Sequence, residues 1–223
     1  MTYHEILTQL QALSSEKTAK IYTRFGVKET VLGVNKGPLR KLAESLGTNE
    51  FLAQEAWDSG IFEMRLIAIT LTDPKWLTPQ KVEAWVVQTD SLPVIDELCF
   101  TWFETMPLGM EQIRTWIDDL SLLHQRLGWN LAIVKAHRKK LADTDLRELI
   151  NRVERELQVA PSLIQDAMNR CLVEISVTNP EFTQEGLELG ERLGVYKEVM
   201  VAKGCTSPYA PDWINAVLRR KQK

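Results

Sequence analysis

The chain has 223 residues, of which 44% are hydrophobic and 26% charged, and its formal net charge is −3. This composition is typical of a soluble globular protein and excludes a disordered or membrane-embedded chain. The near balance of charges gives no bulk attraction to nucleic acid, so DNA binding would require an uneven distribution of charge. The three cysteines are widely spaced and form no zinc motif, and the first residues lack the pattern of a signal peptide. We therefore expect a cytoplasmic protein that needs no metal or other cofactor.

The first predicted helices lie between residues 37 and 72, and basic residues gather around the first of them. Gly37-Pro38 opens a periodic run that Gly47 ends, and residues 49–58 and 61–72 have the pattern of a helix pair. Just before and within the first of these runs lies a cluster of cations with two aromatic neighbours: Tyr22, Arg24, Phe25, Lys28, Lys36, Arg40 and Lys41. Such a cluster suits contacts with phosphates, although solvated helix faces often have the same composition.

Three similar helix pairs follow, and they indicate a repeat. Val82, Trp85 and Val86 show the i, i+3, i+4 pattern of an amphipathic helix. The same pattern returns in two later segments, one with Ile113, Trp116, Ile117 and Leu120, the other with Leu146, Leu149, Ile150, Val153 and Leu157. The anchors of the three patterns are about 31 to 33 residues apart, a spacing typical of helical repeats.

A second helix is predicted after each of these three, and each opens with Ser-Leu. The openings are at Ser91, Ser121 and Ser162, and serine is a favoured N-cap because its hydroxyl accepts a hydrogen bond from a free backbone N–H. Thr78-Pro79 and Asn179-Pro180 place a capping residue before a proline at the first helical position. A final amphipathic helix follows Pro211.

Together these elements predict an all-α fold, an α-α superhelix (solenoid) of HEAT-like helical repeats. No linker interrupts the pattern, so we expect one HEAT-like repeat domain over residues 1–223. The alternative organisation is two packed helical bundles, which the repeats make less favourable.

Equivalent positions in stacked repeats lie side by side, so offsets from the opening serines can be compared. Five residues after the serine lie Asp96, Arg126 and Ala167, and Arg170 is one helical turn beyond Ala167. This spacing predicts one acid and two arginines on a common surface. Asp96 has a structural reading, stabilisation by the helix macrodipole, and a functional one, an anion that stabilises positive charge or orients a water molecule. The arginines have two readings as well, ion pairs on a solvated face or contacts with phosphate.

From residue 22 to residue 182 the sequence resembles the bacterial DNA alkylation repair protein family, the AlkD-like HEAT-repeat alkylpurine DNA glycosylases. The resemblance rests on the order and spacing of five segments: YTRFGVKETVLGVNKGPLRKLA, EAWDSGIFEMRLIA, TDSLPVIDELC, HQR and IQDAMNRCLVEISVTNPEF.

The resemblance implies hydrolysis of the N-glycosidic bond of N3- or N7-alkylated purines in DNA. It places the catalytic aspartate at Asp96, an arginine of the DNA-binding groove at Arg126, and a tyrosine near the lesion at Tyr22. Arg24, Lys28 and Arg170 are further candidates for contacts with DNA. Two tryptophans that flank the damaged nucleotide in active glycosylases are replaced here, by Leu92 and Arg170.

Three functions therefore stay open. The first is an alkylpurine DNA glycosylase, a hydrolase, with Asp96 stabilising charge and Arg126 holding the backbone. The second is a catalytically diverged relative that binds unusual DNA structures, and the third is a helical-repeat scaffold for protein interactions. We expect a monomer whose partner is double-stranded DNA, alkylated or structurally unusual, with no contact to a membrane.

Overall fold

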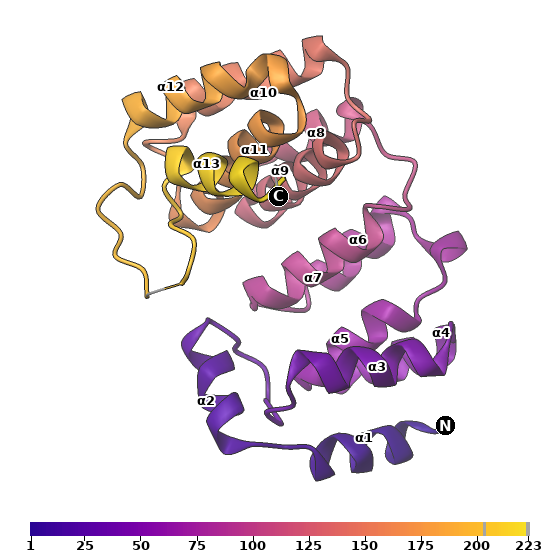
Figure 1. Ribbon diagram of the computed structural model, residues 1–223. Coiled ribbons are helices and arrows are strands. Elements are labelled where there is room, and N and C mark those ends of the chain that lie inside the picture. The colour runs from indigo at the N-terminus through magenta and orange to yellow at the C-terminus, as the bar shows by residue number, and fades with distance from the viewer. Residues whose placement is uncertain (203, 222–223) are drawn as a thin grey trace. The chain divides into compact units, whose positions relative to one another are not determined.

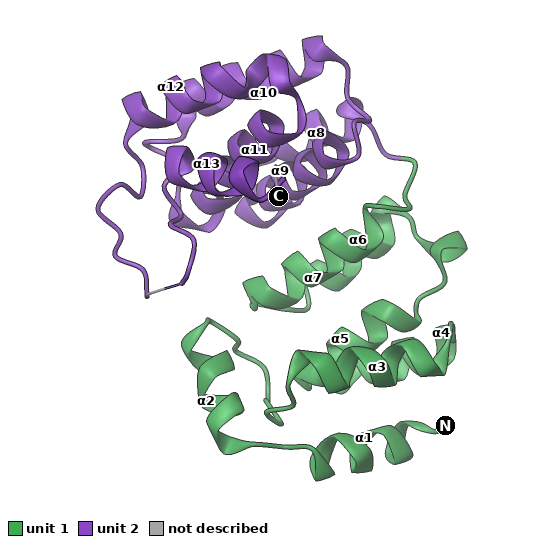
Figure 2. Cartoon of the chain, in the orientation of Figure 1, with its two compact units in different colours: residues 1–107 green, residues 108–223 purple. Residues whose placement is uncertain are grey.

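The computed structural model describes residues 1–202 and 204–221 of the chain. These residues form thirteen α-helices and two short 3-10 helices and contain no strand beyond an isolated bridge between Thr30 and Ile61, which confirms the all-α prediction (Figure 1). The chain divides into two compact units, Met1–Pro107 and Leu108–Lys223 (Figure 2). The single-domain organisation stays a prediction, and the two units are described separately below.

The first unit is a stack of helices whose core contains a cluster of three tryptophans. In this unit α4 packs against α5, and α5 also contacts α3 and α7. The Trp57 and Trp85 rings stack with centroids 4.2 Å apart, and the Trp102 ring lies 4.9 Å from that of Trp85. The helices of the unit are α1 (Tyr3–Ala12), α2 (Glu16–Arg24), α3 (Lys36–Leu46), α4 (Glu50–Asp58), α5 (Phe62–Leu71), η1 (Pro74–Trp76), α6 (Pro79–Val86) and α7 (Leu92–Trp102).

The second unit is also a stack of helices. Helix α9 packs between α8 and α11, and α11 also contacts α10, α12 and α13. The elements of this unit are α8 (Met110–Ile117), α9 (Leu122–His137), α10 (Asp143–Glu156), α11 (Ser162–Thr178), η2 (Pro180–Phe182), α12 (Thr183–Leu193) and α13 (Ala210–Lys221). Helices α9 and α11 are buried along most of their length, which explains why amphipathic periodicity is weak in them and strong in α8 and α10.

The repeated helix pairs are confirmed, but their predicted caps are not. Helices begin next to Ser91 and Ser121, yet neither side chain makes a capping hydrogen bond, and Ser162 lies within α11 behind Pro161. Thr78 behaves as predicted, since its hydroxyl accepts a hydrogen bond from the Lys81 backbone N–H. The Ser91 hydroxyl instead donates a hydrogen bond to Glu29, in the loop between α2 and α3.

In the three repeated patterns, the periodic apolar positions form the core with one exception. Val82, Trp85, Ile113 and Trp116 are all buried, as the pattern predicts. The prediction for Leu120 was wrong, because α8 ends at Ile117 and the Leu120 side chain is 99% exposed. The turn after α8 leaves the helical path before Leu120 reaches the buried stripe.

Close packing of α8 on α9 depends on a glycine, and this generates a stability prediction. A Cβ on Gly128 would lie 2.8 Å from the Ile117 backbone nitrogen and 3.0 Å from the Ile113 carbonyl oxygen. We expect Gly128→Ala to lower the free energy of unfolding by about 1–3 kcal/mol, because the two helices must move apart. Urea unfolding followed by circular dichroism measures this change.

Gly37→Ala is the matched control, since Gly37 lies in helix α3 with open space around its Cβ position. Alanine there removes unfolded-state freedom and should leave stability unchanged or raise it by up to about 1 kcal/mol. Equal stability of the Gly128→Ala protein and the wild type would contradict the account of the α8–α9 contact.

Candidate nucleic-acid interface

A basic segment of the first unit runs from the start of α2 to the first turns of α3. Between residues 16 and 41 the chain has seven basic residues and two acidic ones, Glu16 and Glu29. All seven basic residues are exposed: Lys17, Lys20, Arg24, Lys28, Lys36, Arg40 and Lys41. We call these seven side chains the basic segment. Three of them make ion pairs, Lys20 with Glu16, Lys36 with Glu97 and Arg40 with Glu44, and the other four make none within the described chain.

A buried glutamate of α5 fixes the backbone of this segment. Glu63 is fully buried, and its carboxylate accepts hydrogen bonds from three successive backbone N–H groups, those of Leu32, Gly33 and Val34, at 3.0, 2.7 and 3.1 Å. Consecutive N–H groups that converge in this way form a concave anion site. Gly33 has a φ of +88°, and a Cβ there would lie 2.1 Å from the Ser15 carbonyl oxygen, so only glycine fits.

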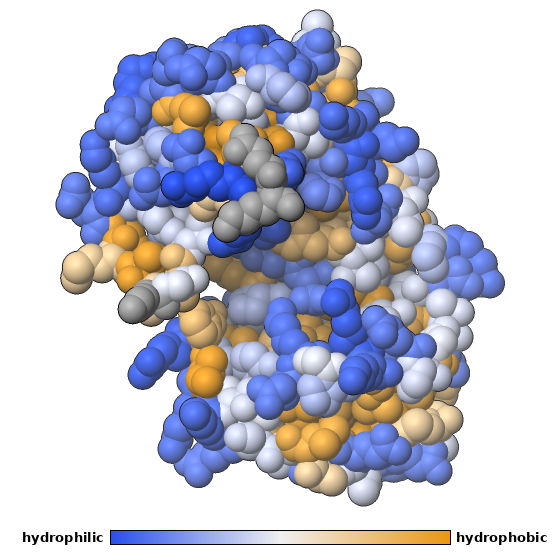
Figure 3. Space-filling model, viewed as in Figure 1, coloured by the Kyte–Doolittle hydropathy of each residue, from blue (hydrophilic) through white to orange (hydrophobic). Residues whose placement is uncertain are grey.

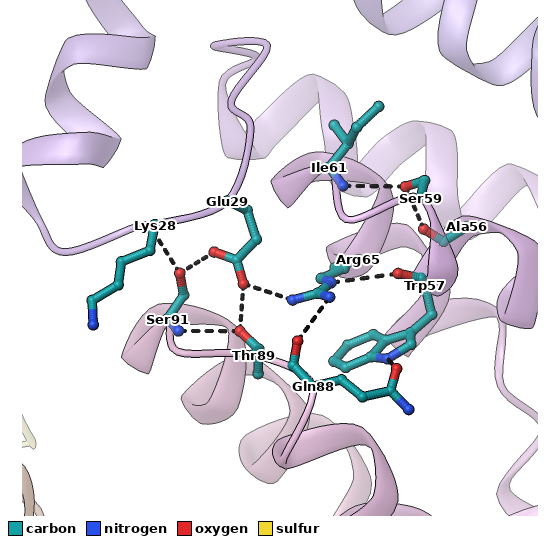
Figure 4. A network of polar contacts seen from close by, with 10 residues as sticks. All are labelled: Lys28, Glu29, Ala56, Trp57, Ser59, Ile61, Arg65, Gln88, Thr89 and Ser91. Atoms are coloured by element: carbon teal, nitrogen blue, oxygen red, sulfur yellow. Dashed lines mark hydrogen bonds and ion pairs between the residues drawn. The ribbon is translucent and has the colours of Figure 1, made fainter.

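A second buried glutamate ties the same segment to α7 (Figure 4). Glu29 forms an ion pair with Arg65 at 2.8 Å and accepts hydrogen bonds from the hydroxyls of Thr89 and Ser91. The Ser91 oxygen in turn accepts a hydrogen bond of 2.7 Å from the Lys28 backbone N–H. Lys28 is therefore attached through Ser91 to the start of the helix that carries Asp96.

Each of the three nitrogens of the Arg65 guanidinium donates a hydrogen bond within this network. Beyond Glu29, it donates to the backbone carbonyls of Trp57 and Gln88 at 3.4 and 2.9 Å, and it lies 4.8 Å above the Trp57 ring. Burial alone would raise the pKa of Glu29, but the hydrogen bonds from Ser91 and Thr89 and the charge of Arg65 lower it below its ordinary value. Glu29 is thus an anion at neutral pH.

The first-unit candidates occupy different environments. Tyr22 is half-buried: its ring lies 5.0 Å from that of Phe62, and its hydroxyl donates to the Val34 carbonyl at 2.8 Å. Burial and the nearby Glu63 raise the pKa of Tyr22. Arg24 and Lys28 are exposed, whereas Leu92 in the first turn of α7 and Asp96 in the second are both half-buried. The structure thus brings Lys28 to the helix of Asp96 and places Tyr22 against the core.

In the second unit, Arg126 lies inside the helix stack. Its side chain is 3% exposed and forms a bidentate pair with Asp166, with distances of 2.7 and 3.0 Å, and it also donates to the Leu163 carbonyl. Such planar pairs are strong and geometrically specific. Asp166 is half-exposed, so the carboxylate side of the pair faces solvent while the guanidinium is covered. In this arrangement the Arg126 guanidinium is covered and its charge is paired with Asp166.

Arg170 follows Asp166 by one turn on α11 and is half-buried. Arg126 therefore contacts the first turns of α11, the helix that also carries Arg170. Asp96 belongs to the other unit, so the grouping of all three on one surface stays a prediction. Among the residues that the structure describes, no cluster of histidine, cysteine, aspartate or glutamate could hold a metal ion.

Sequence reasoning missed Glu29, Glu63 and Asp166. Each is an isolated acid whose partner lies some 30 to 40 residues away along the chain, and no local motif signals such a pairing. None of the helices within the described ranges is both long and apolar enough to cross a membrane.

Comparisons with known proteins agree with this architecture. The family described as DNA alkylation repair enzyme matches residues 6–214. Uncharacterized proteins of Listeria innocua and Listeria monocytogenes are 23% and 22% identical over 238 residues, which cover the whole chain and 99% of each relative. A solved structure from "a new family of proteins related to the HEAT-like repeat DNA glycosylases with affinity for branched DNA structures" matches 99% of this chain and 95% of its own, with a TM-score of 0.84 and 21% identity. The predicted HEAT-like repeat fold is thereby confirmed.

The Glu29–Arg65 pair predicts how stability responds to substitution and pH. Glu29→Gln leaves the buried Arg65 without a counter-charge, so we expect a loss of about 3 kcal/mol in the free energy of unfolding. The folded pKa of Glu29 is below the ordinary value of 4.5, so its contribution is present above that pH and is lost as the pH falls through the lowered pKa. Urea unfolding between neutral pH and pH of about 3 should therefore show a shallower loss of stability in Glu29→Gln than in the wild type.

Glu44→Gln is the control, because Glu44 makes an exposed pair with Arg40. Such pairs contribute little, and the change should stay within about 0.5 kcal/mol. Identical pH profiles for Glu29→Gln and the wild type would refute the assigned role of Glu29.

Proposed function

Because the chain belongs to the DNA alkylation repair enzyme family, we propose that it binds double-stranded DNA through phosphate contacts made by the basic segment of its first unit. The observation that carries this proposal is the separation of charge within residues 16–41. Seven cations are exposed, whereas one of the two acids, Glu29, is nearly covered and already paired with Arg65. The segment therefore has a local excess of positive charge in a chain whose net charge is −3.

The fixed backbone favours the same function. Phosphate contacts position a protein on DNA, and cations on a rigid support lose less conformational freedom when they bind. Glu63 and the Glu29–Ser91 link hold the loop that carries Lys28 at several points along its backbone. Arg24 and Lys28 make no ion pair within the described chain, so they can contact a phosphate without breaking one.

The affinity of the solved relative for branched DNA suggests the kind of DNA that this chain prefers. Branch points and other distorted sites present phosphates at positions that a straight duplex lacks, and contacts with phosphates do not depend on the base sequence. We therefore expect tighter binding to structurally unusual DNA than to a continuous duplex.

A second candidate function is hydrolysis of the N-glycosidic bond of N3- or N7-alkylated purines. It is favoured by Asp96, a half-buried residue near the N-terminus of α7. An alkylated purine already carries positive charge and leaves readily, so the enzyme needs chiefly an anion beside the oxocarbenium-like sugar and an oriented water molecule. Leu92 and Arg170 lack the flat apolar faces of the tryptophans in active glycosylases, so we expect slow hydrolysis at most.

The DNA-binding proposal predicts a steep dependence of affinity on salt. Each phosphate contact contributes about 0.9 to the slope of log K against log salt concentration, because its counterion is released. Removing two contacts in Arg24→Ala/Lys28→Ala should lower the slope by about 2 and weaken binding to every DNA sequence alike. Fluorescence anisotropy with labelled duplexes over a range of salt concentrations measures both effects.

Lys75→Ala is the matched control, since Lys75 is exposed in the same unit but lies outside the basic segment and is paired with Asp73. Its slope should equal that of the wild type. A wild-type affinity that does not change with salt would refute the proposal and favour the scaffold function.

The glycosylase candidate predicts release of methylated purine from alkylated DNA. Asp96→Asn should reduce the rate by about 10²-fold or more, because the neutral amide cannot stabilise the developing positive charge. Asp90→Asn removes an exposed carboxylate just before the same helix and should leave the rate unchanged. Chromatography of the released bases provides the measurement, and absence of release above background at high protein concentration excludes this function.

A further inference from the structure

The second unit contains a pocket that neither the basic segment nor Asp96 explains. It has a volume of about 370 Å³ and lies between α11, the segment that joins α12 to α13, and the first turn of α13. Its lining residues are Asp166, Asn169 and Arg170 of α11, then Tyr196, Val199, Pro208 and Trp213. The three α11 residues are spaced i, i+3 and i+4, so they form one face of that helix.

The wall of this pocket holds a polar atom without a partner. Asn169 is 1% exposed, and its side-chain Nδ2 donates to the Pro208 carbonyl at 2.9 Å. Its other polar atom, Oδ1, is buried and has no hydrogen-bond partner among the described residues. Buried polar atoms are nearly always paired in folded proteins. An acceptor left open beside a cavity therefore marks a place for a donor on a ligand.

The rest of the lining suits a flat aromatic ring. Tyr196 and Trp213 contribute aromatic surface, and Val199 and Pro208 contribute aliphatic surface. Burial and the neighbouring Asp166 carboxylate raise the pKa of Tyr196, so its hydroxyl stays protonated at neutral pH. Apolar walls with a few polar groups at fixed positions are the usual make-up of small-ligand sites.

The lining of the pocket also contains two charged residues, Asp166 and Arg170. Asp166 is held in its bidentate pair with Arg126, which neutralises the carboxylate at the pocket edge. The remaining charged residue of the lining is Arg170, a cation. A flat ring would thus find an aromatic wall and an open acceptor in one place.

We propose that this pocket takes a single unpaired nucleobase of bound DNA, whose N–H group donates to Asn169 Oδ1. The inference rests on the DNA binding proposed above and adds to it the feature of DNA that is read. Every DNA base carries at least one N–H donor, and aromatic walls accept any base face, so the site selects unpaired bases with little regard to sequence. A base inside a duplex has its donors paired and both faces stacked, and it cannot enter. Bulges and branch points supply such free bases.

The test compares three labelled DNAs that differ at one position: a short duplex with one bulged nucleotide, the same duplex with an abasic bulge, and the fully paired duplex. We expect the wild type to bind the base-containing bulge about fivefold or more tightly than the abasic one. The abasic bulge has the same phosphates, so this ratio isolates the contribution of the base. A ratio of about one would overturn the inference, whatever the affinity for the other DNAs.

Variants assign the effect to the pocket. Trp213→Ala and Tyr196→Ala should bring the ratio to about one while affinity for the abasic bulge is unchanged, because they remove aromatic wall and no charge. Tyr196→Phe keeps the ring and should keep most of the preference. Trp76→Ala is the matched control, since Trp76 is exposed in the first unit and should leave the ratio as in the wild type.

The same data separate this inference from the proposed function. If all three DNAs fail to bind, the DNA-binding function itself is refuted and the pocket inference with it. If all three bind equally and with steep salt dependence, the function stands and only the base pocket is refuted. A preference for the base-containing bulge that survives in Trp213→Ala and Tyr196→Ala also refutes it. If either alanine variant fails to fold, the inference is still tested by the affinity ratio of the wild type for the base-containing and abasic bulges, and by whether Tyr196→Phe keeps that ratio.

Discussion

The three backbone N–H groups that converge on the Glu63 carboxylate are the constraint on which the first unit depends. The chain between α2 and α3 has little regular structure of its own, and Gly33 within it has a positive φ of 88°. A buried carboxylate is costly unless it is fully hydrogen-bonded, and this loop supplies the bonds. The loop therefore stabilises the buried Glu63 carboxylate, and the carboxylate in turn fixes the backbone of the loop. Lys28 and Lys36, on either side of residues 32–34, are therefore attached to a fixed stretch of backbone.

Glu29 extends this arrangement toward α7. With Arg65, it makes a buried ion pair in which the guanidinium also donates to two backbone carbonyls. Buried pairs contribute less to stability than their Coulomb energy suggests, but removal of one partner is costly because the other charge stays uncompensated. The network also assigns the Ser91 hydroxyl to Glu29 and to Lys28, which explains why this serine begins a helix without capping it.

Most of the fold could be predicted from the sequence, and rather less of the candidate site. Spacing of apolar residues identified the helix pairs because each helix buries one stripe, as Val82 and Ile113 show. The same reasoning overextended α8 to Leu120, since periodicity does not report where a turn begins. It could not show that Arg126 is covered and paired with Asp166, a contact between residues 40 positions apart. Side-chain partners across helices depend on packing that no local motif encodes.

The link between Glu63 and the loop has a consequence for how the first unit loses its structure. The loop is bonded to α5 through Glu63 and through the Thr30 carbonyl, which accepts from the Phe62 N–H, and the Gly33 carbonyl accepts from Ser15 at the start of α2. When α5 opens, these bonds are lost together, so the loop and the α2 start belong to one cooperative unit of local unfolding. Amide protons of residues 32–34 should then exchange with solvent at the rate set by α5, far slower than expected for a loop without regular structure.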